Sequence, residues 1–331
     1  MRLYSFIALA AFSLSTGCSL PPEDPETQPA QAAYTGGDAQ TGDAQGAADA
    51  GQPVLGPTGI PVEFSKFLSE ASYDAATGAL TLQLTGFDDG DLDAVFAAVP
   101  GLDTAGYLAF TFQDDPLDRH YTALVQESAD GSVWAVVVAD GGQFNRYFSG
   151  SFYERDGDFN TPAVVTGQVA YAGTYAAVSN VDGPGTDLAL VDPAVDDSLL
   201  PHQAGRIDGK VFLNANFTET LVNGSVFDRV LHTDSGAGVP VDLPLPSLAL
   251  IVSDIDESGE FVGDVEFIGG DQTIGSYGGI FSGDAGAVAG VVSLTDIDDN
   301  LYSMDQDEEL GLFVLVQCGQ AGDHAICDSL D

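Results

Sequence analysis

Four kinds of residue are scarce in this 331-residue chain, which has eight lysines and arginines together, four histidines, three cysteines and one tryptophan. Against 51 acidic residues, the few cations leave a formal net charge of −43, which repels nucleic acids and anionic lipid surfaces. We therefore expect no nucleic-acid partner. The acids are interpreted as a solvated exterior, with a dedicated acidic binding face as the alternative.

The scarcity of histidine and cysteine also limits the chemistry. The histidines His120, His202, His232 and His324 lie far apart, with no second ligand at a spacing typical of metal sites. No serine, cysteine or paired-carboxylate arrangement stands out for catalysis, because acids occur everywhere along the chain. We expect no enzyme activity, no metal centre and no cofactor.

A long apolar run occurs at the start of the chain, from Leu3 to Leu14 behind Arg2. It is too short to span a bilayer and has the build of an export signal. Small residues follow it before Cys18, a pattern that resembles the lipobox of bacterial lipoproteins. This resemblance predicts a signal peptide over 1–17, cleavage, and lipidation of Cys18 with palmitate-type chains. A plain signal peptide with a chance cysteine is the alternative.

Residues 18–61 are rich in Pro, Gly, Ala, Gln and Asp and nearly devoid of large apolar side chains. Such a composition cannot offset the entropy of ordering, so it predicts a disordered acidic tether. A flexible linker of this length reaches roughly 35 Å, enough to lift a folded body clear of the lipid headgroups.

After Val62 the chain changes to short apolar runs separated by turn residues, which predicts an all-β body. One short helix is expected at 89–99, where Leu92, Val95, Phe96 and Val99 share a helical face. Strand spacing without intervening helices favours an antiparallel barrel or a sandwich. The expected strands lie within 71–84, 106–113, 120–127, 132–140, 167–178, 186–191, 205–217, 223–231, 245–253, 259–270, 275–294 and 310–318.

The run 275–294 is a strand-like stretch that is unusually rich in glycine. Alternation places Tyr277 and Phe281 on one face with Gly279 between them, and Gly283 begins the turn of a hairpin. Glycine is kept inside a strand where the strand bends sharply or another group approaches closely, as in a small barrel. The hairpin residues of interest are Gly275, Tyr277, Gly279, Phe281, Gly283 and Gly290.

Three stretches resemble transferrin-binding protein B and related surface lipoproteins. "GGIFSGDAGAVAGVVSL" (278–294) is similar to the glycine and aromatic hairpin near the end of their barrel. Residues 121–155 with 165–178 resemble their handle-like sheet and first barrel strands, and 205–228 resembles the next hairpin. The resemblance implies a β-rich handle over 62–158 and an eight-stranded antiparallel β-barrel over 159–318. By the same division, a tail follows at 319–331.

The resemblance also implies a binding module for a host or environmental ligand, a protein or a small molecule, with iron or haem uptake as one use. Its partners would include the membrane, through the lipid on Cys18, and a surface lipoprotein assembly modulator. Ser19 after the cysteine indicates the outer membrane, with the cell surface expected and the periplasmic face as the alternative. A transmembrane porin is disfavoured because the chain has a single Trp for the aromatic girdles.

A second hypothesis is a structural or adhesive envelope protein with calcium-stabilised acidic loops. The best calcium candidates, Asp296, Asp298 and Asp305, lie in "DIDDNLYSMDQDEE", for which a solvated loop is the alternative. The stretch 254–261 starts like a calcium loop, but its twelfth position is Val265, so a hairpin turn is expected there.

Two cysteines remain once Cys18 is assigned to the lipid. Cys318 and Cys327 are an even pair in an exported, oxidising setting, so we expect them to form a disulfide. A zinc or haem role, with His324 as the only nearby second ligand, is the alternative.

Overall fold

The computed structural model describes residues 53–85, 92–144, 146–160, 168–234, 240–295 and 307–329. The chain divides into the units Met1–Ala50 and Gly51–Asp331, and the described residues belong to the second. Cys18, residues 18–52 of the expected tether and the calcium candidates Asp296, Asp298 and Asp305 lie outside the described residues. The expected disorder is wrong for residues 53–61, because Leu55 and Pro61 form a bridge and Ile60 is buried in an apolar cluster.

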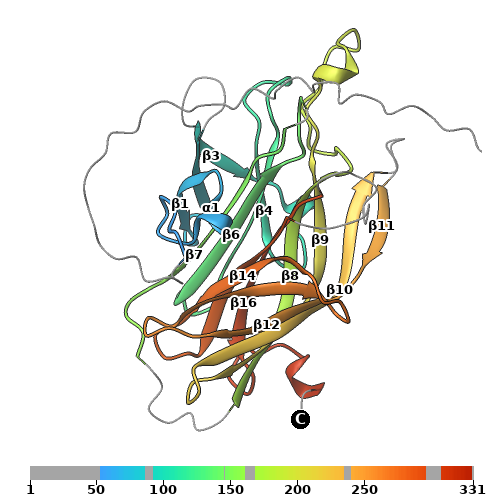
Figure 1. Cartoon of the computed structure of the whole chain (residues 1–331). Coiled ribbons are helices and arrows are strands. Elements are labelled where there is room, and N and C mark those ends of the chain that lie inside the picture. The colour runs from blue at the N-terminus through green and yellow to red at the C-terminus, as the bar shows by residue number, and fades with distance from the viewer. Residues whose placement is uncertain are drawn as a thin grey trace, which may run out of the picture. The chain divides into compact units, whose positions relative to one another are not determined.

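The first sheet is an antiparallel meander in which each strand pairs with the next along the chain (Figure 1). It curls until its ends meet, since the N–H of Phe67, just before β1, donates to the carbonyl of Ser149 in β7 at 3.1 Å. We call this sheet the handle. Its strands are β1 (Leu68–Asp74), β2 (Ala79–Leu84), β3 (Leu92–Ala98), β4 (Leu108–Phe112), β5 (Tyr121–Glu127), β6 (Val133–Asp140) and β7 (Ser149–Arg155).

The second sheet closes on itself. Its order is β11-β10-β12-β13-β14-β15-β16-β8-β9, and β9 pairs back with β10, so eight strands form a closed barrel. The remaining strand, β11, pairs with the second half of β10. The strands are β8 (Gln168–Asp182), β9 (Ala204–Asn216), β10 (Leu221–Asp234), β11 (Pro240–Leu245), β12 (Leu248–Asp254), β13 (Glu260–Phe267), β14 (Thr273–Phe281), β15 (Ala287–Leu294) and β16 (Glu309–Gln317).

The expected fold class is therefore confirmed: the described chain is nearly all β, with an eight-stranded antiparallel barrel after a smaller β-rich part. Helical structure in the described residues is limited to α1 (Val62–Ser65) and the 3-10 turns η1 (Pro100–Leu102), η2 (Asp197–Leu199) and η3 (Cys327–Ser329). No helix among these residues is long and apolar enough to cross a membrane. The domain division at 158/159 stays a proposal.

The helix expected at 89–99 is wrong, because the described part of this stretch forms strand β3. Ala94 and Phe96 are buried while Val95 between them is 71% exposed, so burial follows a period of two. Phe96 pairs with Leu80 and Ala94 with Leu82 across β2. This pairing with distant residues outweighs the local helical spacing.

A second correction concerns 186–191, "TDLALV", which was expected as a strand. It lies instead in the long connection between β8 and β9, and Leu190 is 96% exposed. Neither neighbouring strand extends to it, so its apolar residues are not drawn into a sheet.

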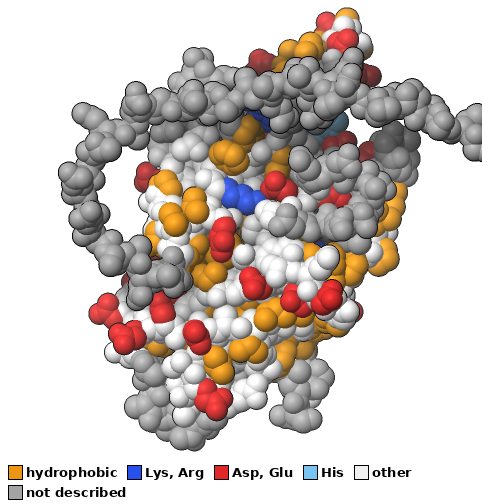
Figure 2. Space-filling view, in the orientation of Figure 1, with side chains coloured by type: hydrophobic (Ala, Val, Ile, Leu, Met, Phe, Trp, Pro, Cys, Tyr) orange, Lys and Arg blue, Asp and Glu red, His pale blue; other side chains and the backbone are white. Residues whose placement is uncertain are grey.

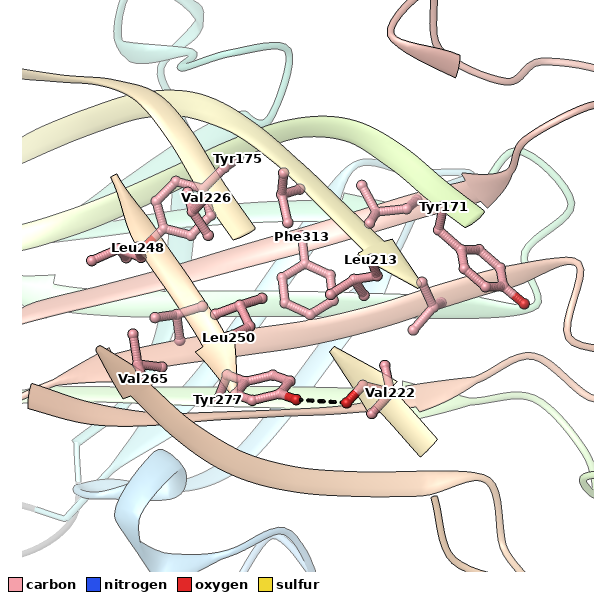
Figure 3. Packing of buried hydrophobic residues seen from close by; sticks show 14 of the residues in the cluster. Tyr171, Tyr175, Leu213, Val222, Val226, Leu248, Leu250, Val265, Tyr277 and Phe313 are labelled. Atoms are coloured by element: carbon pink, nitrogen blue, oxygen red, sulfur yellow. Dashed lines mark hydrogen bonds between the residues drawn. The ribbon is translucent and has the colours of Figure 1, made fainter. Parts of the chain in front are cut away.

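Aromatic rings inside the barrel lie close to glycines of the neighbouring strands. Figure 3 shows three of these rings. The side chains of Tyr175, Tyr277 and Phe313 point into the interior. A Cβ at Gly311 would lie 2.2 Å from Cζ of Tyr175, and one at Gly290 would lie 2.4 Å from Cζ of Phe313. The glycines leave room for rings that cross to the neighbouring strand. Two reasons were given for the glycines of the 275–294 run, a sharp bend and the close approach of another group. At Gly290 the second reason applies, because the Phe313 ring lies against it.

The handle packs on the outer wall of the barrel. Leu124 and Val137 of the handle share one apolar cluster with Val178, Val291 and Leu312, which point outward from the barrel strands. The opposite face of the handle has its own core around Leu80, Phe96 and Val136. Three cores therefore hold the described body together: the barrel interior, the handle interior and the layer between them.

Candidate functional site

The described side chains that point into the barrel pack against one another. Twenty-six buried apolar residues form this cluster. At the end near the start of β16, Arg229 forms an ion pair with Glu309, and the Tyr175 hydroxyl donates to Oε1 of Glu309 at 2.6 Å. The described interior is thus a packed core that supports the loops.

One surface is built from loops of both sheets. The connection between β8 and β9, yellow-green in Figure 1, extends beyond the strands and contacts the handle. Gln143 of the handle donates from Nε2 to the carbonyls of Leu117, at 2.8 Å, and Leu199, at 2.9 Å. The N–H of Gly141 donates to the carbonyl of His202 at 3.2 Å. These bonds tie the connection to two handle loops.

Ionic side chains fix the handle side of this joint. Arg119 forms an ion pair with Asp140 and donates to the carbonyls of Gln143 and Arg146, each at 3.0 Å. Burial raises the pKa of Asp140, while hydrogen bonds from Phe148 and Arg119 oppose that shift. The loop after β6 is therefore held by a buried carboxylate.

Two further contacts hold the connection itself. Nε2 of the buried His120 lies 3.1 Å from a carboxylate oxygen of Asp187, and Oε1 of Gln113 accepts from the N–H of Ala189 at 2.9 Å. The long connection thus has a defined conformation, although it contains no strand.

Large apolar side chains are exposed on this joint. Leu117 is 39% exposed, Phe144 60% and Leu199 44%, and Gln143 joins the loops that carry them. Leu190, next to the anchored Ala189, is 96% exposed. The projection at the top of Figure 2 carries apolar side chains next to acidic ones. We call Leu117, Phe144, Leu190 and Leu199 the apical patch.

The sequence did not single out the apical patch. Leu190 belongs to the run that was expected to form a strand, and the other three are isolated apolar residues in loops. An apolar residue in a loop becomes informative only when its exposure is known, since most are buried under the loop.

The predicted hairpin residues lie in the barrel wall, away from this surface. Tyr277 and Phe281 point into the interior, and Gly279 pairs with Gly290 across β14 and β15. The Tyr277 hydroxyl donates to the carbonyl of Ile251 at 2.6 Å. Gly275 also lies in β14, and Gly283 lies in the turn that follows it. In the structure these hairpin residues pack within the barrel.

Where the structure describes the acidic stretches, several of their side chains form hydrogen bonds or ion pairs within the protein. Oδ1 of Asp256 accepts from the N–H groups of Ser258, at 2.8 Å, and Glu260, at 2.9 Å, as expected for a hairpin turn. Glu308 pairs with Lys66 at 2.8 Å, and Glu309 is the buried partner of Arg229. Within the described ranges, no group of three His, Cys, Asp or Glu could hold a metal ion.

The tail is closed by a disulfide between Cys318 and Cys327, with the two Cα atoms 5.4 Å apart. The N–H of Cys318 donates to the carbonyl of Ala170 in β8 at 2.8 Å, which holds the start of the tail against the barrel.

Comparisons with known proteins place these features beside surface lipoproteins. No family model and no curated protein matches the chain. The solved structures that match include transferrin binding protein B of Haemophilus parasuis Hp5, at 14% identity over 75% of this chain and 44% of that one, with a TM-score of 0.37. Another is transferrin binding protein B of Neisseria meningitidis, at 11% identity over 75% and 51%, with a TM-score of 0.32.

A third is the N-lobe domain of lactoferrin binding protein B of Moraxella bovis, at 13% identity over 75% of this chain and 95% of that domain, with a TM-score of 0.30. The chain thus spans about half the length of the two transferrin binding proteins (44% and 51%) and most of the single lobe (95%). Two of these solved structures carry the name of the protein that three stretches of the sequence resemble.

Proposed function

We propose that this protein is a binding module tethered to the outer membrane by a lipid on Cys18, and that it captures a folded protein through the apical patch. The observation that carries the proposal is the exposure of Leu117, Phe144, Leu190 and Leu199 on loops that hydrogen bonds hold in place. Exposed apolar patches with polar rims are typical of protein interaction sites.

The construction of the patch supports this proposal in two ways. Its loops are held by Gln143, Arg119 and His120, so little conformational entropy remains to be lost on binding. The described barrel interior is a packed core, so it is a rigid support for the loops.

The proposal also names the class of protein that is captured. Transferrin and lactoferrin are the ligands named for the similar proteins, and we propose the broader class, a host or environmental protein that carries iron or haem. Export through a surface lipoprotein assembly modulator would place the apical patch outside the cell, at the end of the tether formed by residues 18–52.

The experiment compares substitutions of exposed apolar residues inside and outside the apical patch. Residues 19–331 are immobilised, exposed to host serum, and the captured proteins are identified and titrated. Phe144→Ser with Leu199→Ser should weaken capture about tenfold or more, since central apolar anchors dominate interface energies. Ile268→Ser is the matched control, because Ile268 is 60% exposed like Phe144 but lies between β13 and β14.

A protein retained by wild type and by Ile268→Ser, yet lost by the double variant, supports the proposal. Equal capture by all three proteins refutes the apical patch as the binding surface. Iron and haem analysis of the captured protein tests its proposed cargo.

The anchor has its own test. Labelled palmitate should enter the wild-type protein, and Cys18→Ala should abolish both labelling and partition into detergent. Unlipidated wild-type protein in the soluble periplasm would refute the anchored location.

The alternative of calcium-stabilised acidic loops depends on Asp296, Asp298 and Asp305. If it holds, calcium should raise the melting temperature, and Asp296→Asn with Asp298→Asn should remove the rise. An unchanged melting temperature would exclude that alternative.

A further inference from the structure

A second surface lies on the outer barrel wall, away from the apical patch. The ladder between β12 and β13 is regular from Leu248↔Phe267 to Leu250↔Val265 and then stops. Over Ile251–Asp254 the two strands face each other without regular pairing until the single bridge Ile255↔Phe261. A groove of about 740 Å³ runs along this gap and is closed on one side by the segment that leads into α1.

The groove is lined by apolar and acidic residues. Its apolar lining includes Leu55, Val252 and Val262, of which Leu55 is 59% and Val252 56% exposed. Its lining includes five carboxylates and no lysine or arginine; the acids are Glu63, Asp254, Asp256, Glu260 and Asp264.

Burial and neighbouring charges both act on the acids of the groove. Burial raises the pKa of Glu63, a hydrogen bond with Ser276 lowers it, and the neighbouring Asp264 raises it. Burial and Asp256 likewise raise the pKa of Glu260, and the charge of Arg155 lowers it. Arg155 donates to the carbonyls of Ser258, at 2.8 Å, and Phe281, at 2.9 Å. Arg155 therefore offsets part of the negative charge of the groove, whose own lining contains no lysine or arginine.

We propose that this groove binds an extended peptide segment of a protein partner, with lysine or arginine side chains between the carboxylates and apolar side chains on Leu55 and Val252. The charge of the groove selects a basic segment. It also argues against the protein's own residues 19–52, which lead to the groove at Pro53 but carry acids and no lysine or arginine. The proposal does not depend on the function proposed for the apical patch.

The test uses a synthetic peptide of about seven residues that alternates lysine and leucine, which in an extended conformation presents one charged and one apolar face. Its binding to residues 19–331 is measured by calorimetry at about 50 mM salt, where surface charge is weakly screened. Binding should be absent for a peptide that alternates glutamate and leucine.

The decisive comparison uses two double variants. Each removes two negative charges, one variant inside the groove and the other outside it. Glu63→Gln with Asp264→Asn should weaken binding about fivefold or more, as expected for close charge pairs. Glu70→Gln with Asp271→Asn should change it less than about twofold, because these exposed acids lie outside the groove and supply only the overall field. Val252→Ser should weaken binding at high salt as well, because it removes apolar lining of the groove.

Equal weakening by the two double variants would overturn the proposal, because the attraction would then be diffuse. Absence of binding to the intact chain would also overturn it. Binding that appears only after deletion of residues 19–52 would assign the groove to that segment instead.

Discussion

Arg229 of β10 and Glu309 of β16 form an ion pair inside the barrel in which both side chains are 0% exposed. Loss of one partner leaves the other charge buried and uncompensated. Arg229→Met should therefore lower the free energy of unfolding by about 3–5 kcal/mol. Lys210→Met, which breaks an exposed pair with Asp228, should cost at most about 1 kcal/mol. Urea denaturation measures both; equal costs would refute the buried pair.

The close approach of Tyr175 to Gly311 predicts a second destabilised variant. A Cβ at Gly311 would lie 2.2 Å from Cζ of the Tyr175 ring, so Gly311→Ala should cost about 1–3 kcal/mol through overpacking. Gly101→Ala is the control, since a Cβ there meets nothing within 4 Å, and it should change stability by less than about 0.5 kcal/mol. Thermal melts of the two variants decide; similar melting temperatures would contradict the packing.

The layer between handle and barrel bears on whether the barrel folds without the handle. A closed barrel predicts that a fragment starting near Asn160 folds alone. In the structure the outward side chains of Val178, Val291 and Leu312 are buried against the handle. The fragment would expose them, so we now expect it to aggregate or to melt without cooperativity. A cooperative melt of the isolated fragment would show that the handle is dispensable.

The disulfide restrains a short loop. Cys318 and Cys327 are separated by nine positions. Closing this loop lowers the entropy of the unfolded chain, which raises its free energy by about 2.5 kcal/mol on the chain-entropy model. Cys318→Ala with Cys327→Ala should thus lower the melting temperature modestly and leave ligand capture unchanged. Thiol titration of the native protein should find no free thiol, and two free thiols would refute the bridge.

His202 predicts a pH-dependent contribution near the apical loops. Its Nδ1 lies 3.0 Å from Oδ2 of Asp182, and this hydrogen bond raises the His202 pKa above its ordinary value of 6.5. The raised pKa means that the stabilisation is complete below pH 6.5 and is lost as the pH rises through the folded-state pKa. His202→Gln should therefore lower the melting temperature at about pH 5.5 more than at about pH 8.5. An equal loss at both values would contradict the pair.

Local patterns along the chain predicted most strands of this fold. Alternating apolar residues in 205–217 predicted β9, because a strand with one buried face needs a period of two. Continuous apolar runs in 132–140 and 310–318 predicted β6 and β16, which are buried on both faces. The cysteines near the end of the chain similarly predicted their own bridge, since few thiols were available to pair.

Tertiary contacts decided the rest. Residues 92–98 became a strand because Phe96 and Ala94 meet Leu80 and Leu82, and 186–191 became a loop because no strand lies beside it. The ion pair of Arg229 and Glu309 joins residues 80 positions apart, and the apical patch combines loops from two sheets. Such juxtapositions depend on which strands pair, and that choice follows from the burial of the whole sheet, which no local stretch of sequence contains.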